Sequence, residues 1–268
     1  RGLGDVYKRQ AMASIGHDVV GVDVDERKVA SLSKGVAPFF EPDLQEMLTE
    51  GITSGRLRFT TTMADASGAQ VHFVGVGTPQ VKGGYAADLT YVNAAIDGLL
   101  PYLSKGNVVA GKSTVPVGTA ATLAERVNPT GATLVWNPEF LREGWAVQDT
   151  IDPDRLVAGV PSGPKGQRAA DILREVYHPS VAKGTPFLVT DYATAELVKV
   201  SANAFLATKI SFINAMAEIA EVTGADVTQL ADAIGYDDRI GRKFLGAGID
   251  SGAEELSADP VVLADRAG

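Results

Sequence analysis

The chain has 268 residues, of which 45% are hydrophobic and 21% are charged, and its formal net charge is −9. This composition is that of a folded globular protein, and its negative charge argues against nucleic acid or an anionic membrane surface as a partner. Cysteine is absent, which excludes disulfides, thiolate metal sites and thiol nucleophiles in this chain, and no apolar run reaches the ~20 residues that cross a bilayer. We therefore expect a cytoplasmic protein without a bound metal.

Short β-branched runs alternate with helical patterns over the first two thirds of the chain. Several runs are apolar throughout, as expected for strands that helices cover on both faces. Predicted strands lie in DVVGVDV, RLRFTT, VHFVGVG, NVVAG, TLVWN, RLVAGV and PFLVT, and predicted helices at 26–34, 42–54, 88–103, 118–127 and 164–176. The alternation predicts an α/β fold with a doubly wound parallel sheet of Rossmann type, the first strand of which is missing from the sequence.

From Asp191 the pattern changes to a long helical stretch. An Asp or Thr cap, Glu196 in the first turn and Gly224 as a stop predict one helix of about thirty residues. A second helix, DVTQLADAIG, follows. We therefore predict a first domain over 1–190 and a small helical domain over 191–268. A long helix rich in Ala and Ile favours a homodimer through residues 191–223.

Asp23 ends the apolar run VVGVDVD. In a doubly wound sheet, an acidic residue at the end of the second strand accepts hydrogen bonds from the adenosine ribose, and its charge favours NAD over NADP. The alternative is an acidic residue that caps the next helix. Asp23 is thus a candidate NAD ligand.

Three further strand ends carry small or hydroxyl residues and a proline-fixed turn, where open α/β sheets bind ligands. They are VGVGTP (74–79), GKSTVPVGT (111–119) and WNPEFLREG (136–144). Any one of them alone is compatible with a simple strand-to-helix turn. Glu139 and Glu143 share a face if their segment is helical; otherwise they are near neighbours, and a solvated surface is the alternative interpretation.

Lys199 and Asn203 are four residues apart on the long predicted helix, so their side chains point the same way. They lie at the edge of an apolar stripe, where an unpaired lysine costs free energy and asparagine adds nothing to helix stability. A structural lysine is one interpretation. We favour an electrophilic pair, an ammonium and a carboxamide directed at a developing oxyanion.

Several motifs together closely resemble the UDP-glucose 6-dehydrogenase family of nucleotide-sugar dehydrogenases. The resemblance covers about Ala11 to Ile249, and NPEFLREG with the Lys-x-x-x-Asn helix makes it specific. The motifs are EPDL, GTP, ADLTYV, KSTVPVGT, NPEFLREG, AELVKVSANAFLATKISFINAMAEIAE and DDRIGRKFLGAGI.

The resemblance implies an enzyme that uses NAD to oxidise the C6 alcohol of UDP-glucose to a carboxylate in two hydride transfers, through an aldehyde held as a thiohemiacetal and then a thioester. It also assigns roles to residues of this sequence. The implied NAD ligands are Asp23 and Lys28 at the adenosine ribose, with Gly77, Thr78, Ser113 and Glu143 along the rest of the cofactor. The implied catalytic residues are Thr114 and Glu139 for water or proton transfer, and Lys199 and Asn203 for the alkoxide and the thioester oxyanion. The implied substrate ligands are Glu139, Phe140, Leu141, Lys199, Asn203, Arg239, Lys243, Phe244, Leu245 and Gly246, with the arginine often reaching the site of the partner subunit.

The sequence departs from the family pattern at both ends. Family members begin with a strand and a G-x-G-x-x-G turn, but here RGLGDVYKRQ places Asp5 at the third glycine, where its charge would repel a pyrophosphate. We interpret residues 1–10 as a non-native scar. Near the other end Glu255 stands where the nucleophilic cysteine is expected, and the C-terminal UDP-binding domain is absent. A carboxylate cannot replace that thiolate, so we expect a fragment that does not complete turnover.

Other interpretations remain open. GDP-mannose and UDP-N-acetylmannosamine dehydrogenases would use the same scaffold with other sugar and base pockets. The β-hydroxyacid dehydrogenases also have a Lys-x-x-x-Asn helix and need no thiol, but STVPVGT and NPEFLREG favour the sugar enzymes. A non-catalytic module that binds NAD or dimerises is a further alternative, favoured by the absence of cysteine.

Overall fold

The computed structural model of the chain describes residues 4–81, 83–84, 86–142 and 144–248. It forms two compact units, Arg1–Pro79 with Ala87–Leu197 and Gln80–Ala86 with Val198–Gly268. Within the described part of the chain, no helix combines the length and the apolar character that a membrane span requires.

The elements occur close to their predicted positions. The strands are β1 (Val19–Val22), β2 (Leu57–Thr60), β3 (Val71–Val74), β4 (Val108–Gly111), β5 (Thr133–Trp136), β6 (Leu156–Gly159) and β7 (Phe187–Thr190). The helices are α1 (Gly4–Ser14), α2 (Glu26–Ser33), α3 (Leu44–Thr53), α4 (Thr90–Leu99), α5 (Thr119–Val127), α6 (Ala146–Ile151), α7 (Pro164–Val176), α8 (His178–Ala182), α9 (Tyr192–Thr223) and α10 (Val227–Gly235). Three short 3-10 turns complete the list: η1 (Met63–Ala66), η2 (Leu100–Tyr102) and η3 (Asn128–Thr130).

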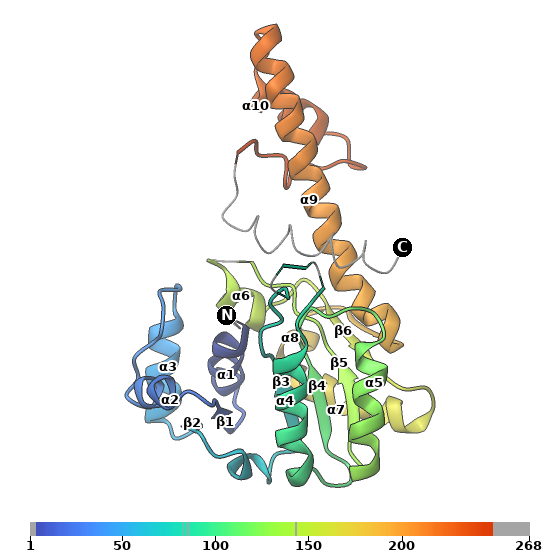
Figure 1. Cartoon of the computed structure of the whole chain (residues 1–268). Helices are drawn as coiled ribbons and strands as arrows, with labels where there is room; N and C mark the ends of the chain where they lie inside the picture. The colour runs from blue at the N-terminus through green and yellow to red at the C-terminus, as the bar shows by residue number, and fades with distance from the viewer. Residues whose placement is uncertain (1–3, 82, 85, 143, 249–268) are drawn as a thin grey trace. The chain divides into compact units, whose positions relative to one another are not determined.

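The strands of the first unit form two sheets. β1 pairs in parallel with β2, and β3 to β7 form a five-stranded sheet in chain order. Among the described residues no strand joins β1 to β3, and α1 lies between the two sheets (Figure 1). Met12 of α1 belongs to the same buried cluster as Val108 of β4, and Val19 of β1 packs against that cluster. One core therefore continues across the break in the sheet, which agrees with the predicted doubly wound fold.

β4, β5 and β6 are buried along their whole length, as their unbroken apolar runs predict. Gly111 at the end of β4 is required by packing, because a Cβ there would overlap the ring of Trp136 on β5. The strands thus approach closely at the carboxyl end of the sheet, where the polar loops after β3 and β4 lie.

One pairing differs from the prediction of a wholly parallel sheet. β5 and β6 pair antiparallel, through Trp136 and Gly159, whereas β6 and β7 are parallel to each other. The connection between β5 and β6 contains only the six-residue helix α6, and it brings the chain back into the sheet from the end at which it left.

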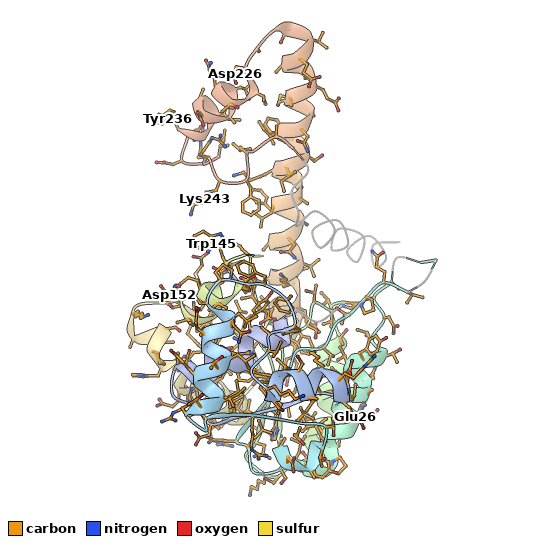
Figure 2. All side chains as sticks on the ribbon, turned by 90° about the vertical axis from the view of Figure 1, so that its left-hand side faces the viewer. Glu26, Trp145, Asp152, Asp226, Tyr236 and Lys243 are labelled. Carbon is orange, nitrogen blue, oxygen red and sulfur yellow. The ribbon has the colours of Figure 1, made fainter. Side chains whose placement is uncertain are left out.

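The second unit is built on α9, which begins in the first unit at Tyr192. α10 follows after a turn at Gly224, and Asp226 and Tyr236 mark its two ends in Figure 2. Ile213 of α9, Ala231 of α10 and Leu245 of the following loop form the buried core of this unit. The apolar stripe of α9 therefore packs against α10 and against the loop that follows α10.

Candidate active site

Asp23 lies directly after β1 and faces the start of α2. Its carboxylate is 2.6 Å from the Lys28 ammonium and accepts a hydrogen bond of 3.2 Å from the Asp25 N–H. Although burial would raise the pKa of Asp23, these hydrogen bonds hold it below its usual value, so the group is charged at neutral pH. The structure thus brings together the two residues predicted for the adenosine ribose.

The loops that follow β3 and β4 are joined by two side-chain hydrogen bonds. Thr78 Oγ1 donates to the carbonyl oxygen of Thr114 over 2.7 Å, and Ser113 Oγ donates to that of Val76 over 2.6 Å. Gly77 lies between the two tied positions of the β3 loop, and all four predicted residues are partly buried. The two loops are therefore held together at the carboxyl ends of β3 and β4.

A buried polar cluster lies next to these loops, at the ends of β4 and β5. Lys112 Nζ donates to the Asn137 backbone oxygen over 2.9 Å and to its Oδ1 over 3.1 Å, and Tyr177 OH donates to the same Oδ1 over 2.8 Å. Lys8 of α1 completes the cluster by donating to Tyr177 OH over 3.1 Å. Burial lowers the pKa of Lys112 and raises that of Tyr177.

None of these four residues belongs to the predicted site. Lys112 and Asn137 directly follow strands β4 and β5, and a polar residue at the carboxyl end of a buried strand is the signal that would have suggested them. Tyr177 and Lys8 carry no such signal, because tertiary packing alone brings them to the strand ends.

Glu139 extends toward the cluster from the loop after β5. Its Oε2 lies 3.6 Å from Lys112 Nζ and makes no hydrogen bond to a described residue. It borders a cavity of about 20 Å³, room for one water molecule, which Lys8, Phe140 and Arg155 also line. A water there would contact the carboxylate, which suits the predicted role of Glu139 in holding water or moving a proton.

The segment around Glu139 is a loop and not a helix in its described part, so the helical alternative does not apply. Arg142 holds this loop to α6 through two side-chain hydrogen bonds to Asp149 of 2.5 and 3.0 Å. Phe140 stacks under Arg155, whose Cζ is 3.8 Å from the ring centroid, and Leu141 packs against the core beside α3. Glu143, a predicted cofactor ligand, lies outside the described residues.

In the second unit, Lys199 and Asn203 form the predicted pair. Lys199 Nζ donates to Asn203 Oδ1 over 3.5 Å, which confirms that the two side chains share one face of α9. Asn203 is 8% exposed and Lys199 is half-buried. The pair is therefore not a solvated surface feature of the helix.

The loop after α10 holds the other predicted substrate ligands, and one of them, Leu245, has a buried side chain. This side chain is 2% exposed in the core beside Ile213, so only its backbone is available to a ligand. Lys243, labelled in Figure 2, and Gly246 are exposed, and Phe244 is half-buried with a positive φ of 63°. Arg239 is bound to Asp237 over 2.6 Å.

Lys209 and Asn214 of α9 shape this loop, and neither was predicted. Lys209 Nζ donates to the carbonyl oxygens of Ile240 and Gly241 over 3.0 and 3.2 Å. Asn214 Oδ1 accepts the Gly248 N–H over 2.9 Å. The long helix therefore holds the candidate substrate loop by two side chains.

Comparison with known proteins gives the family. Residues 3–181 match the NAD binding domain, and residues 193–268 the central domain, of the UDP-glucose/GDP-mannose dehydrogenase family. The chain is 45% identical over 260 residues to a UDP-glucose 6-dehydrogenase of Rhizobium meliloti (strain 1021) and 44% identical over 257 residues to UDP-glucose 6-dehydrogenase TuaD of Bacillus subtilis (strain 168). These alignments cover 95% and 94% of this chain but 59% and 54% of the two relatives.

Two solved dehydrogenase structures have a fold similar to that of this chain. A UDP-glucose dehydrogenase from Pyrobaculum islandicum superimposes with a TM-score of 0.84 at 36% identity, over 97% of this chain and 64% of that one. A GDP-mannose dehydrogenase from Pseudomonas aeruginosa gives 0.81 at 26% identity, over 97% and 62%. The chain spans less than two thirds of each of these relatives. Because the family match extends over most of the chain, this protein belongs to the UDP-glucose/GDP-mannose dehydrogenase family, as its motifs predict.

Proposed function

We propose that this chain is the NAD-binding and central part of a UDP-glucose 6-dehydrogenase. Its reaction is the oxidation of the C6 alcohol of UDP-glucose to a carboxylate, with two hydrides passed to NAD. The proposed domains are 1–190 for NAD and 191–268 for the helical domain, and the proposed location is the cytoplasm. The names of the Rhizobium and Bacillus relatives support UDP-glucose as the substrate.

One observation of the structure carries the NAD assignment. The charged carboxylate of Asp23 directly follows β1. The loops of Thr78 and Thr114, which are hydrogen-bonded to each other, follow β3 and β4 of the neighbouring sheet. A dinucleotide binds across such strand ends, with its adenosine ribose at the acidic residue and its other half beyond the break in strand order. The residues at these strand ends therefore fit the adenosine ribose and the far half of NAD.

The proposed chemistry follows from the donors and acceptors present. Bound NAD supplies the hydride acceptor, and the alcohol releases its hydride readily only as its proton is removed and its oxygen is stabilised. Lys199 and Asn203 offer the donors for that oxygen. Thr114 and Glu139 are proposed to hold the water or to transfer the proton.

Completion of the second oxidation requires a thiolate that this sequence does not contain. Glu255, at the expected position, lies outside the described residues, and a carboxylate does not form the thiohemiacetal. We therefore expect no steady release of NADH with UDP-glucuronate when the purified chain is supplied with NAD and UDP-glucose. Sustained formation of UDP-glucuronate would contradict this part of the proposal.

Replacing Asp23 tests the NAD site. We expect Asp23→Asn to weaken NAD binding about tenfold in isothermal titration, since the ribose hydroxyls lose a charged acceptor. Asp18→Asn is the matched control, because Asp18 precedes the same strand and is exposed. A wild-type chain without NAD affinity that still forms a stable dimer would favour a purely structural module. Equal affinity of wild type and Asp23→Asn would reject the ribose role.

The choice of sugar nucleotide needs a separate titration. The Pseudomonas structure shows that a GDP-mannose enzyme uses the same fold, so the fold does not decide the substrate. We expect UDP-glucose to bind the NAD-loaded chain more tightly than GDP-mannose or UDP-N-acetylmannosamine. A preference for either of the other two would reassign the substrate within the family.

We also propose that the chain forms a homodimer through α9. One face of α9 is exposed and follows the 3,4 spacing of a helix that packs against a partner helix. Its apolar members include Phe205, Phe212, Ile219 and Val222, which are 66%, 47%, 55% and 89% exposed. The face consists of Phe205, Thr208, Phe212, Ala215, Ile219 and Val222. A second copy would remove this apolar surface from water.

A further inference from the structure

Glu196 is a buried acid whose carboxylate holds the beginning of another helix. It lies on α9 within the first unit and is 1% exposed. Its Oε2 accepts the Gly118 N–H over 2.7 Å and its Oε1 accepts the Ala120 N–H over 2.6 Å. The first N–H groups of a helix have no partner within the helix, and a carboxylate there is also favoured by the helix dipole. Glu196 thus supplies from α9 the cap that α5 does not receive from its own Gly118.

The segment that Glu196 holds is the far end of the loop of Ser113 and Thr114. The near end of that loop is already fixed by the hydrogen bonds from Ser113 to Val76 and from Thr78 to Thr114. Removing the carboxylate would release the end of the loop that joins α5. The other end, which is hydrogen-bonded to the loop after β3, would stay in place. The loop would then lose one of its two attachments.

We infer that Glu196 is a positioning residue that acts through the Thr114 loop. The inference rests on the proposed NAD function, because it assigns this loop to the nicotinamide half of the cofactor. Glu196 itself is not assigned any contact with cofactor or substrate. Its removal should weaken the nicotinamide half of the site and leave the adenosine half, at Asp23, unchanged.

The test compares two ligands on the full chain. ADP-ribose carries the adenosine half of NAD and lacks the nicotinamide. We expect Glu196→Gln, which keeps the size of the side chain but offers one acceptor oxygen in place of two, to weaken binding of NAD about tenfold and that of ADP-ribose by less than about twofold. Glu218→Gln is the matched control, because Glu218 is exposed on the same helix. It should change neither affinity.

The outcomes separate a positioning role from a merely structural one. A parallel loss of both affinities, or no loss of either, would overturn the inference while leaving the NAD proposal intact. If Glu196→Gln does not fold, Glu196→Asp is tested in its place. Because aspartate retains the charge, this variant should keep part of the additional affinity that the wild-type chain has for NAD relative to ADP-ribose.

A second measurement applies even if the wild-type chain binds no NAD. Amide hydrogen exchange should become faster in Glu196→Gln at Gly118 and Ala120, and also over the loop residues 113–117. Faster exchange at the two amides alone would show a local cap without any effect on the loop, and would overturn the inference.

Discussion

Replacing Lys8 by methionine is expected to stabilise the protein by about 2 to 3 kcal/mol at pH 7. Lys8 is 7% exposed, and burial, partly offset by the charge of Glu139, lowers its pKa to about 8. Its ammonium donates to Tyr177 OH, and burial also lowers the pKa of the nearby Lys112. Lys8 and Lys112 are both buried beside a single carboxylate, Glu139, so the cluster holds more basic groups than acidic ones.

The pH dependence gives the sign of this effect. Between pH 8 and the ordinary lysine value of 10.5, the unfolded chain holds the Lys8 proton and the folded chain releases it. The free energy of unfolding therefore rises with pH through this window, by about 3 kcal/mol if Lys8 acts alone. Tyr177 opposes the rise only above pH 10, because burial raises its pKa.

Urea unfolding between pH 7 and 9.5 measures the stabilisation at pH 7 and the first part of the rise, about 2 kcal/mol. In Lys8→Met the rise with pH should be much smaller than in the wild type. The exposed Lys183 provides the control Lys183→Met, which should follow the wild-type curve. A wild-type free energy of unfolding that stays constant over this range would contradict the burial of a charged Lys8.

Replacing Phe212 by serine is expected to weaken the proposed dimer about 30- to 150-fold. Phe212 lies in the middle of the exposed apolar face of α9 and is 47% exposed in the single chain. Each dimer contains two copies of the face, so a single substitution removes two buried rings. Together they contribute about 2 to 3 kcal/mol to association, because each ring is already half-buried before the subunits meet.

Sedimentation equilibrium at several protein concentrations would measure this change. Phe40→Ser is the matched control, because Phe40 is 91% exposed but lies far along the chain from α9, in the segment before α3. It should leave the dimer unchanged. A wild-type chain that sediments as a monomer at high micromolar concentration would reject the proposed interface.

Much of the fold follows from local sequence patterns. The apolar runs that become β3 to β6 are short and β-branched, and the long amphipathic stretch ends at Gly224, which adopts a positive φ of 74° as a helix stop. The helices α1, α6 and α8 were not predicted, and the last two have only six and five residues. Helices so short have little periodicity, and their stability comes from the surfaces on which they pack.

Some features of the candidate site also follow from local sequence, and others do not. Strand-end position was enough to predict Asp23, and helical spacing was enough to predict Lys199 with Asn203, whereas Lys28 was implied only by the family resemblance. Leu245 was assigned to the substrate because its motif implied it, but an apolar side chain in a small helical unit is buried with the core first. Spacing alone does not show which residues of a loop face inward.

The sequence by itself determined the alternation of strands and helices, the acidic end of β1 and the spacing of the lysine and asparagine, because each depends on residues a few positions apart. Only the tertiary structure decided the antiparallel entry of β6, the buried cluster of Lys8, Lys112 and Tyr177, and the bond from Glu196 to the start of α5. These features join residues that are 23 to 169 positions apart. Such contacts form when whole elements pack, and the free energy of burying their polar groups depends on neighbours that local patterns do not specify.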